Sequence, residues 1–166
     1  IWTATCLERK GTAVLTQVGD LREFKIFEEL NDRELEVIAK IARTEELGEG
    51  AHLTDVGAPA ARLYLIKKGS VTIMASGPHG EDLPVDEVGA GEIVGWSTLT
   101  GPYIYRASAV TAQKTDLIVI NGNMLREVFE VNNHIGYRVL KGIGYVVARR
   151  LAGMEGKMAG NNPEKG

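Results

Sequence analysis

The sequence predicts an α+β fold that is mainly β: a β-roll, a jelly-roll-like double-stranded helix, with N-terminal helices and a long C-terminal helix. Apolar residues recur at helical spacing before residue 44 and again after residue 122. Between these segments, turn residues separate short apolar or alternating runs, a pattern typical of a roll or sandwich of short strands. The chain also has 20 glycines among its 166 residues, which favours frequent turns.

Two helices are expected at the start of a domain that spans residues 20–154 and follows an N-terminal extension, residues 1–19. The first begins near Asp20 and carries five apolar residues: Leu21, Phe24, Ile26, Phe27 and Leu30. The second is "DRELEVIAKIAR", with Asn31 or Asp32 as its N-cap. Its apolar face consists of Leu35, Ile38, Ala39 and Ala42.

The strands are expected between residues 44 and 120. The runs "RLYLIKKG" and "SVTIMA" flank Gly69, and this pattern predicts a β-hairpin. The runs "LPVDEVG" and "ASAVTAQKTDLIVIN" supply further strands. Because strand follows strand without intervening helices, the pattern does not indicate alternating parallel units.

Helical spacing returns near Asn123, where "MLREVFEVN" predicts a short helix. A long helix follows, and residues 155–166 are expected to form a flexible tail. The long helix has a wide apolar stripe, which predicts that it packs on another element: Ile135, Val139, Leu140, Ile143, Val146, Val147, Leu151 and Met154. Arg150 continues the row formed by Ile135, Val139, Ile143 and Val146, although Arg149 and Arg150 as a pair are expected on a solvated edge of the helix. Its glycines, Gly136, Gly142 and Gly144, lower its intrinsic stability or permit close approach of another element.

The composition argues against several classes of function. The net charge of −3 argues against nucleic acid as the main partner, and no run of about 18 apolar residues could span a membrane. Cys6 is the single cysteine, which excludes a disulfide within the chain and favours a cytoplasmic location. His52, His79 and His134 lack metal-site spacing. No catalytic constellation is visible, so we expect no enzyme activity, metal or resident cofactor.

Four segments of the chain match a known pattern: "IFEELNDRELEVIA", "LGEGAHLTDVGAPAARLYLIKKGSVTI", "VGAGEIVG" followed by "RASAV", and "GYRVLKGIGYVVARRL". Together they resemble the cyclic nucleotide-binding domain family, which includes the sensor domains of catabolite-activator-type regulators and of cyclic-nucleotide-dependent kinases and channels. The resemblance covers about residues 21–151. It implies an eight-stranded β-roll with a ligand beneath a short cassette helix. It also implies that the long helix forms a homodimer interface or closes over the pocket.

The resemblance is most informative in the phosphate-binding cassette. The family has Phe or Ile, Gly and Glu there, and an Arg about ten positions later; this chain has Val94, Gly95 and Trp96, then Arg106. The family pattern implies that backbone N–H groups and Arg106 bind a phosphate, and that the glutamate accepts a hydrogen bond from the ribose 2′-hydroxyl. Trp96 stands in place of that glutamate, and an indole has no acceptor.

The residues expected to bind the ligand follow from this match: Gly95, Trp96, Ser97, Thr98, Leu99, Arg106 and Ala107. A shifted register that uses Glu92 as the ribose-binding acid would break the match at Gly95 and Arg106, and we reject it. Two alternatives remain open. Arg106 could be a surface arginine paired with an acid, and Trp96 could pack the core of the roll rather than contact a ligand.

The expected function is therefore that of a non-enzymatic sensor. It would bind a cyclic nucleotide, such as cyclic AMP or cyclic GMP, or another small anion, and signal through the long helix of a homodimer. No DNA-recognition helix follows Leu151, which predicts either a stand-alone sensor or a piece of a larger regulator without a nucleic-acid or membrane partner of its own. The alternative is a degenerate domain that has lost nucleotide binding and serves as a dimerisation or protein-interaction scaffold.

Overall fold

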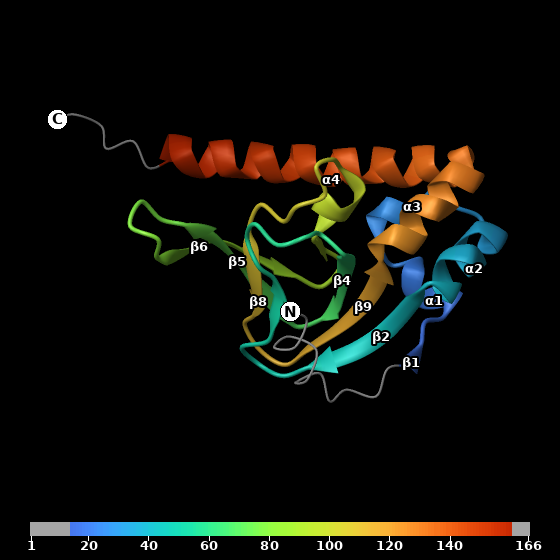
Figure 1. Ribbon diagram of the computed structural model, residues 1–166, viewed down its shortest axis with the longest axis horizontal. Coiled ribbons are helices and arrows are strands. Elements are labelled where there is room, and N and C mark those ends of the chain that lie inside the picture. Colours follow the sequence, from blue (N-terminus) through green and yellow to red (C-terminus); the bar gives the residue numbers. More distant parts are fainter. Residues whose placement is uncertain (1–13, 161–166) are drawn as a thin grey trace.

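The computed structural model describes residues 14–160, and within them two antiparallel sheets form the predicted β-roll (Figure 1). The first sheet has the strand order β1 (Val14–Leu15), β2 (Ala42–Leu47), β9 (Thr115–Asn121), β4 (Arg62–Lys68) and β7 (Ile93–Val94). The second has the order β3 (His52–Thr54), β8 (Ser108–Thr111), β5 (Ser70–Ser76) and β6 (Asp82–Gly89). The mainly β fold class is confirmed.

Helices precede, interrupt and follow the roll. They are α1 (Val18–Leu21), the 3-10 helix η1 (Lys25–Phe27), α2 (Asp32–Lys40), the 3-10 helix η2 (Trp96–Leu99), α3 (Gly122–Val131) and α4 (Asn133–Gly160). The first predicted helix is therefore two short pieces, although all five of its apolar residues are buried. Asn31 caps α2, because its side chain accepts a hydrogen bond from the Glu34 N–H at 3.0 Å. Helix α2 ends at Lys40, so the expectation that Ala42 lies on it is wrong: Ala42 begins β2.

Strands β4 and β9 of the first sheet are buried on both faces, because helices cover one face of the sheet and the second sheet covers the other. In β4, Leu63 and Leu65 join a helix–sheet core, while Tyr64 and Ile66 join a roll core between the sheets. The helix–sheet core also includes Phe24, Leu35, Ile118, Leu125 and Val139. The roll core also includes Leu53, Val71, Val88, Ala109 and Leu117. The alternation along β4 follows from the two-residue period of a strand.

The predicted hairpin at Gly69 is wrong. Strand β4 pairs with β7 and β9, whereas β5 pairs with β6 and β8, so the chain changes sheets at this glycine. Gly69 has φ +98°, and a Cβ there would lie 2.5 Å from Thr115 Oγ1. A glycine is needed for this corner, because an L side chain would meet both backbone strain and a close neighbour.

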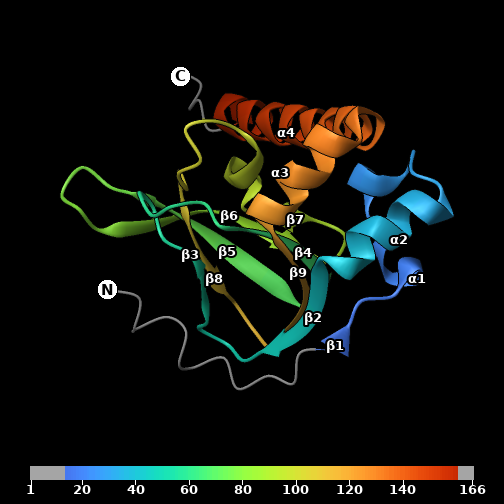
Figure 2. The same ribbon diagram turned by 45° about the vertical axis from the view of Figure 1, so that its right-hand side comes forward.

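Helix α4 lies along one side of the whole molecule, over α3 and the front helices at one end and over the mouth of the roll at the other (Figures 1 and 2). Ile135, Val139, Ile143 and Val146 of its predicted stripe are buried. The helix continues beyond the predicted boundary at Met154 to Gly160. At Gly142, a Cβ would lie 2.6 Å from Ile26 Cα, so this glycine permits the close contact between α4 and η1.

Three expectations fall on other parts of the chain. Cys6, most of the predicted N-terminal extension, and residues 161–166 of the predicted tail lie outside the described residues. Within residues 14–160, no helix has the length and apolar character needed to cross a membrane.

Candidate functional site

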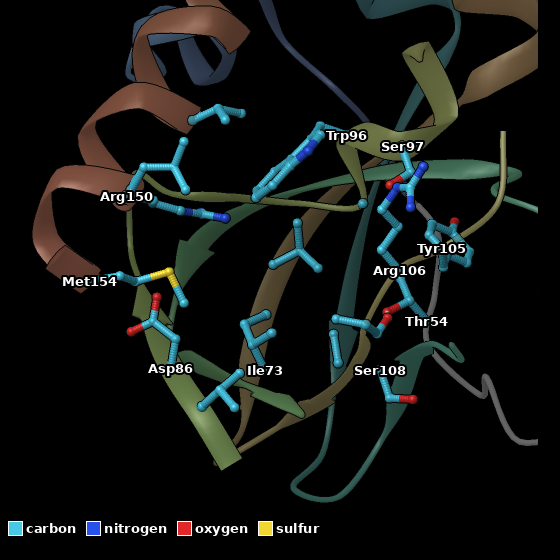
Figure 3. Close-up of a pocket in the computed structure, with 17 residues that line it drawn as sticks. Thr54, Ile73, Asp86, Trp96, Ser97, Tyr105, Arg106, Ser108, Arg150 and Met154 are labelled. Carbon is cyan, nitrogen blue, oxygen red and sulfur yellow. The ribbon is translucent and has the colours of Figure 1, made fainter. Parts of the chain in front are cut away.

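A cavity of about 280 Å³ lies between the mouth of the roll and α4 (Figure 3). We call it the roll cavity. Its walls are largely apolar and come from both sheets and from α4: Ile73, Val85, Val94, Val147, Leu151 and Met154. Its lining also contains five of the seven predicted ligand-binding residues: Gly95, Trp96, Ser97, Arg106 and Ala107. The structure thus brings residues 95–97 and residues 106–107, which lie about ten positions apart in the sequence, to the same cavity.

Gly95 sets the direction of the first of these segments. It precedes η2 with φ +86°, a left-handed conformation that favours glycine. A Cβ at this position would lie 2.8 Å from the Arg62 carbonyl oxygen and 3.3 Å from Tyr105 Cε1. The turn therefore requires both the backbone freedom and the small size of glycine, and it places Trp96 and Ser97 at the cavity.

Tyr105 fixes the second segment. Its buried hydroxyl donates a hydrogen bond to the Arg62 carbonyl at 2.8 Å and accepts one from the Arg62 N–H at 2.9 Å. Its own backbone carbonyl accepts from the Gly57 N–H at 2.8 Å. These contacts anchor the residue immediately before Arg106 to β4 and to the loop after β3, and so they position Arg106 and Ala107.

Arg106 is exposed at the edge of the roll cavity. Figure 3 shows its guanidinium beside Ser97. Among residues 14–160, no carboxylate lies within ion-pair distance of Arg106 and no hydrogen bond joins it to another residue. The alternative of a surface arginine paired with an acid therefore finds no support in the described part of the chain.

Trp96 lies between a hydrophobic core and the roll cavity. It is half-buried, packs against the helix–sheet core and also lines the roll cavity. Its ring lies 4.8 Å from the guanidinium carbon of Arg150 on α4, within the range of a cation–π contact. The indole, which the sequence match places at the position of the family's glutamate, connects the cassette to the long helix.

Arg150 lines the roll cavity, in the same row of α4 as the buried apolar residues. Its side chain is 13% exposed, whereas that of Arg149 is 55% exposed, so the predicted solvated edge is wrong for Arg150. Arg150 donates to Glu92 Oε2 at 3.2 Å and to the Ile93 carbonyl oxygen, and Arg149 also pairs with Glu92. Burial lowers the pKa of the Arg150 guanidinium, and the hydrogen bond to Glu92 opposes that shift.

Glu92 does not serve the roll cavity. Its carboxylate faces the two arginines of α4, and it is not part of the cavity lining. The register that excludes Glu92 from the ligand site is therefore consistent with its position. Its role in the structure is to hold the C-terminal half of α4 against the segment that leads into the cassette.

The remaining two predicted residues lie elsewhere. Thr98 is fully buried, and Arg126 of α3 donates a hydrogen bond to its carbonyl and lies 3.4 Å from its hydroxyl. Leu99 packs against the helix–sheet core. Neither side chain lines the roll cavity. Their contacts instead fix the orientation of η2 relative to α3.

Several lining residues were not predicted, among them Thr54, Asp86 and Ser108. Nothing in their local sequence marks them, because sheet topology brings them to one cavity. A usable signal existed for α4: Val147, Leu151 and Met154 lie at helical spacing beside the main stripe. Within the described residues, no cluster of three or more His, Cys, Asp or Glu suits a metal ion. The arrangement is suited to binding a small anion.

Comparisons with known proteins identify the family to which this fold belongs. The family model of the cyclic nucleotide-binding domain matches residues 44–132. No curated protein matches the chain.

Among solved structures, a cyclic nucleotide-binding protein from Geobacter metallireducens is 29% identical, with 82% of this chain and 98% of that one covered and a TM-score of 0.75. A cyclic nucleotide-binding domain from Methylobacillus flagellatus is 17% identical, with coverage of 93% and 91% and a TM-score of 0.80. The regulatory subunit of a cAMP-independent protein kinase A from Trypanosoma brucei is 22% identical, with coverage of 78% and 45% and a TM-score of 0.68. With more than half of its residues matched by the family model, the chain belongs to the cyclic nucleotide-binding domain family.

Proposed function

We propose that the protein is a non-enzymatic sensor that binds a cyclic nucleotide or another small anion in the roll cavity. The observation that carries this proposal is Arg106, a guanidinium at the edge of an apolar cavity with no ion-pair partner among residues 14–160. A charge-assisted hydrogen bond from such a group to a phosphate contributes about 1.5–3 kcal/mol. The Trypanosoma brucei relative belongs to a cAMP-independent kinase and is a triple mutant bound to cAMP, so cyclic AMP is a ligand to test rather than one that this relative assigns.

The signal in this proposal is a change in the position of α4. Val147, Arg150, Leu151 and Met154 of this helix contribute to the lining of the roll cavity, so a bound ligand touches the helix directly. A ligand shifts a conformational equilibrium only by as much as it prefers one state. Contacts that exist in one pose of α4 and not in another supply that preference.

We further propose that α4 is the interface of a homodimer. Large apolar side chains on it are exposed in the monomer: Tyr137, Leu140 and Tyr145. Gly144 lies in open space near them and would let a partner helix approach closely. Sedimentation equilibrium tests this: a monomer at high protein concentration contradicts the dimer and leaves the ligand proposal intact.

Thermal denaturation with cyclic AMP and cyclic GMP tests ligand binding. At about 100 times Kd, a ligand that binds the native state adds about 2.7 kcal/mol. For a domain of this size, that raises Tm by roughly 5–10 °C. Arg106→Ala should abolish the shift, whereas Arg149→Ala, which removes an arginine outside the cavity lining, should keep it. An unchanged Tm with both nucleotides contradicts cyclic-nucleotide sensing.

A further inference from the structure

Most polar side chains that line the roll cavity are already engaged. The Thr54 hydroxyl donates to the Ala107 carbonyl at 2.9 Å, and the Ser108 hydroxyl accepts from the Val56 N–H at 3.0 Å. The Tyr105 hydroxyl is occupied by the backbone of Arg62. These groups shape the wall of the cavity, and each already has a hydrogen-bond partner within the protein.

Two other polar side chains of the cavity lining are not engaged in this way. Neither Arg106 nor Ser97 has a side-chain hydrogen bond with any residue in the range 14–160, and Figure 3 shows them side by side. Together they offer a guanidinium and a hydroxyl, a donor set suited to one anionic group. The anion of a ligand therefore belongs at this pair.

The cavity offers no carboxylate next to that anion position. Its lining contains one carboxylate, that of Asp86 on β6, which lies 3.5 Å from Lys157 Nζ. Figure 3 shows Asp86 beside Met154, across the cavity from Arg106. The neighbour of Ser97 is instead Trp96, whose indole donates a hydrogen bond but accepts none. A hydroxyl beside the ligand's anion would find no charged acceptor.

We infer that the roll cavity recognises a small anion carried on an aromatic or apolar body and does not select for a hydroxyl next to that anion. Trp96 is the residue that determines this specificity. Arg150 holds its ring by a contact of 4.8 Å, and the ring lines the cavity with an apolar surface in place of a carboxylate. This inference rests on the proposed binding of an anion at Arg106.

The size of the cavity limits the body of the ligand. A volume of about 280 Å³ is just below the roughly 300–1,000 Å³ typical of small-molecule pockets. A single small organic anion with an aromatic body suits this volume. A cyclic nucleotide and a simpler aromatic phosphate share this chemistry, and the sugar hydroxyl distinguishes the two sources.

Isothermal titration calorimetry with three probes tests the inference: cyclic AMP, 2′-deoxy cyclic AMP and phenyl phosphate. We expect the two nucleotides to bind with Kd values within about threefold of each other, because nothing in the site reads the 2′-hydroxyl. A site in which a carboxylate accepts a hydrogen bond from this hydroxyl would separate the two Kd values by roughly ten- to a hundredfold. Phenyl phosphate is expected to bind and to lose affinity in Arg106→Ala.

Two variants at position 96 complete the test. Trp96→Glu is expected to create a preference of roughly tenfold or more for cyclic AMP over its 2′-deoxy form. Trp96→Phe keeps an aromatic ring, and it is expected to show no such preference. If Trp96→Glu does not fold, the comparison of the two nucleotides on the unmodified chain still decides the question.

The outcomes separate this inference from the proposed function. A tenfold or greater preference of the unmodified chain for cyclic AMP overturns the inference and leaves the proposed function standing. Failure of all three probes to bind the folded protein overturns the inference, and it overturns the proposed function as far as cyclic AMP is concerned. Binding that Arg106→Ala does not weaken places the anion elsewhere and also overturns both.

Discussion

The guanidinium of Arg150 lies 4.8 Å from the centre of the Trp96 ring, and this contact joins α4 to the cassette. The same guanidinium donates to Glu92 Oε2 and to the Ile93 carbonyl. One arginine therefore ties the long helix to three consecutive features of the cassette: its lead-in, its strand β7 and its first helical residue. A displacement of Trp96 in the cavity would therefore also alter the surface against which α4 packs.

Replacing Arg150 should weaken this attachment measurably. We expect Arg150→Met to lower the free energy of unfolding by about 1–3 kcal/mol, through loss of the charged hydrogen bonds and the cation–π contact. The matched control is Arg149→Met, whose side chain is 55% exposed and shares Glu92, and it should cost less than about 1 kcal/mol. Urea denaturation of both variants checks this, and equal losses would contradict the buried role of Arg150.

The glycines of α4 provide a second matched pair. Gly142→Ala should destabilise the protein, because a Cβ there would lie 2.6 Å from the backbone of Ile26. Gly153→Ala should stabilise it by up to about 1 kcal/mol, since it has nothing within 4 Å and alanine has the higher helix propensity. Thermal denaturation measures both, and stabilisation by both substitutions would show that α4 is not held against η1 at Gly142.

Two glycines with the same φ allow the cost of backbone strain to be measured apart from the cost of a close contact. Gly91 and Gly95 both have φ +86°, but a Cβ at Gly91 meets nothing within 4 Å, whereas one at Gly95 lies 2.8 Å from the Arg62 carbonyl oxygen. Gly91→Ala should cost about 1–2 kcal/mol for the left-handed conformation alone. Gly95→Ala should cost more and should also impair ligand binding, because the cassette must move. Equal costs with binding intact would refute this account of Gly95.

The link between α1 and β4 predicts a pH dependence of stability. Lys67 Nζ donates to Asp20 Oδ1 at 2.9 Å, and this hydrogen bond is the main cause that lowers the pKa of Asp20 below its ordinary value of 3.8. Because the folded-state pKa is depressed, the stabilisation is complete above the unfolded-state pKa and is lost as the pH falls through the folded-state value.

The unmodified chain should therefore lose more stability between about pH 5 and about pH 2 than Asp20→Asn does. Lys67→Met should flatten the pH profile in the same way, and the double variant should add nothing further. Denaturation at a series of pH values measures this. Parallel profiles for the unmodified chain and Asp20→Asn would rule out a contribution of this pair.

The fold could be predicted from the sequence where local periodicity determined the outcome. The buried residues of the first helices and of α4, such as Phe24 and Val139, follow from their spacing. The pairing of β4 could not be predicted in this way. A strand–glycine–strand pattern describes both a hairpin and a corner between two sheets, and the close approach of Thr115 to Gly69 depends on distant sequence.

The candidate site was predictable only along the cassette. Gly95, Ser97 and Arg106 lie at the roll cavity as the spacing indicates. The family resemblance implied that the long helix could close over the pocket, but it did not identify Arg150 as part of the lining, because a solvated arginine and a buried one look alike in sequence. Arg150 is buried through its contact with Glu92, 58 residues away along the chain. Contacts of this range are set by the topology of the roll.

The most direct test of the central claim is calorimetric titration of the unmodified chain and of Arg106→Ala with cyclic AMP. The account predicts that the unmodified chain binds and that Arg106→Ala loses roughly ten- to a hundredfold in affinity, the equivalent of one charged hydrogen bond. Equal affinity in the two proteins, or no heat of binding with the folded unmodified chain, would contradict the assignment of Arg106 as the anion-binding residue for a cyclic nucleotide.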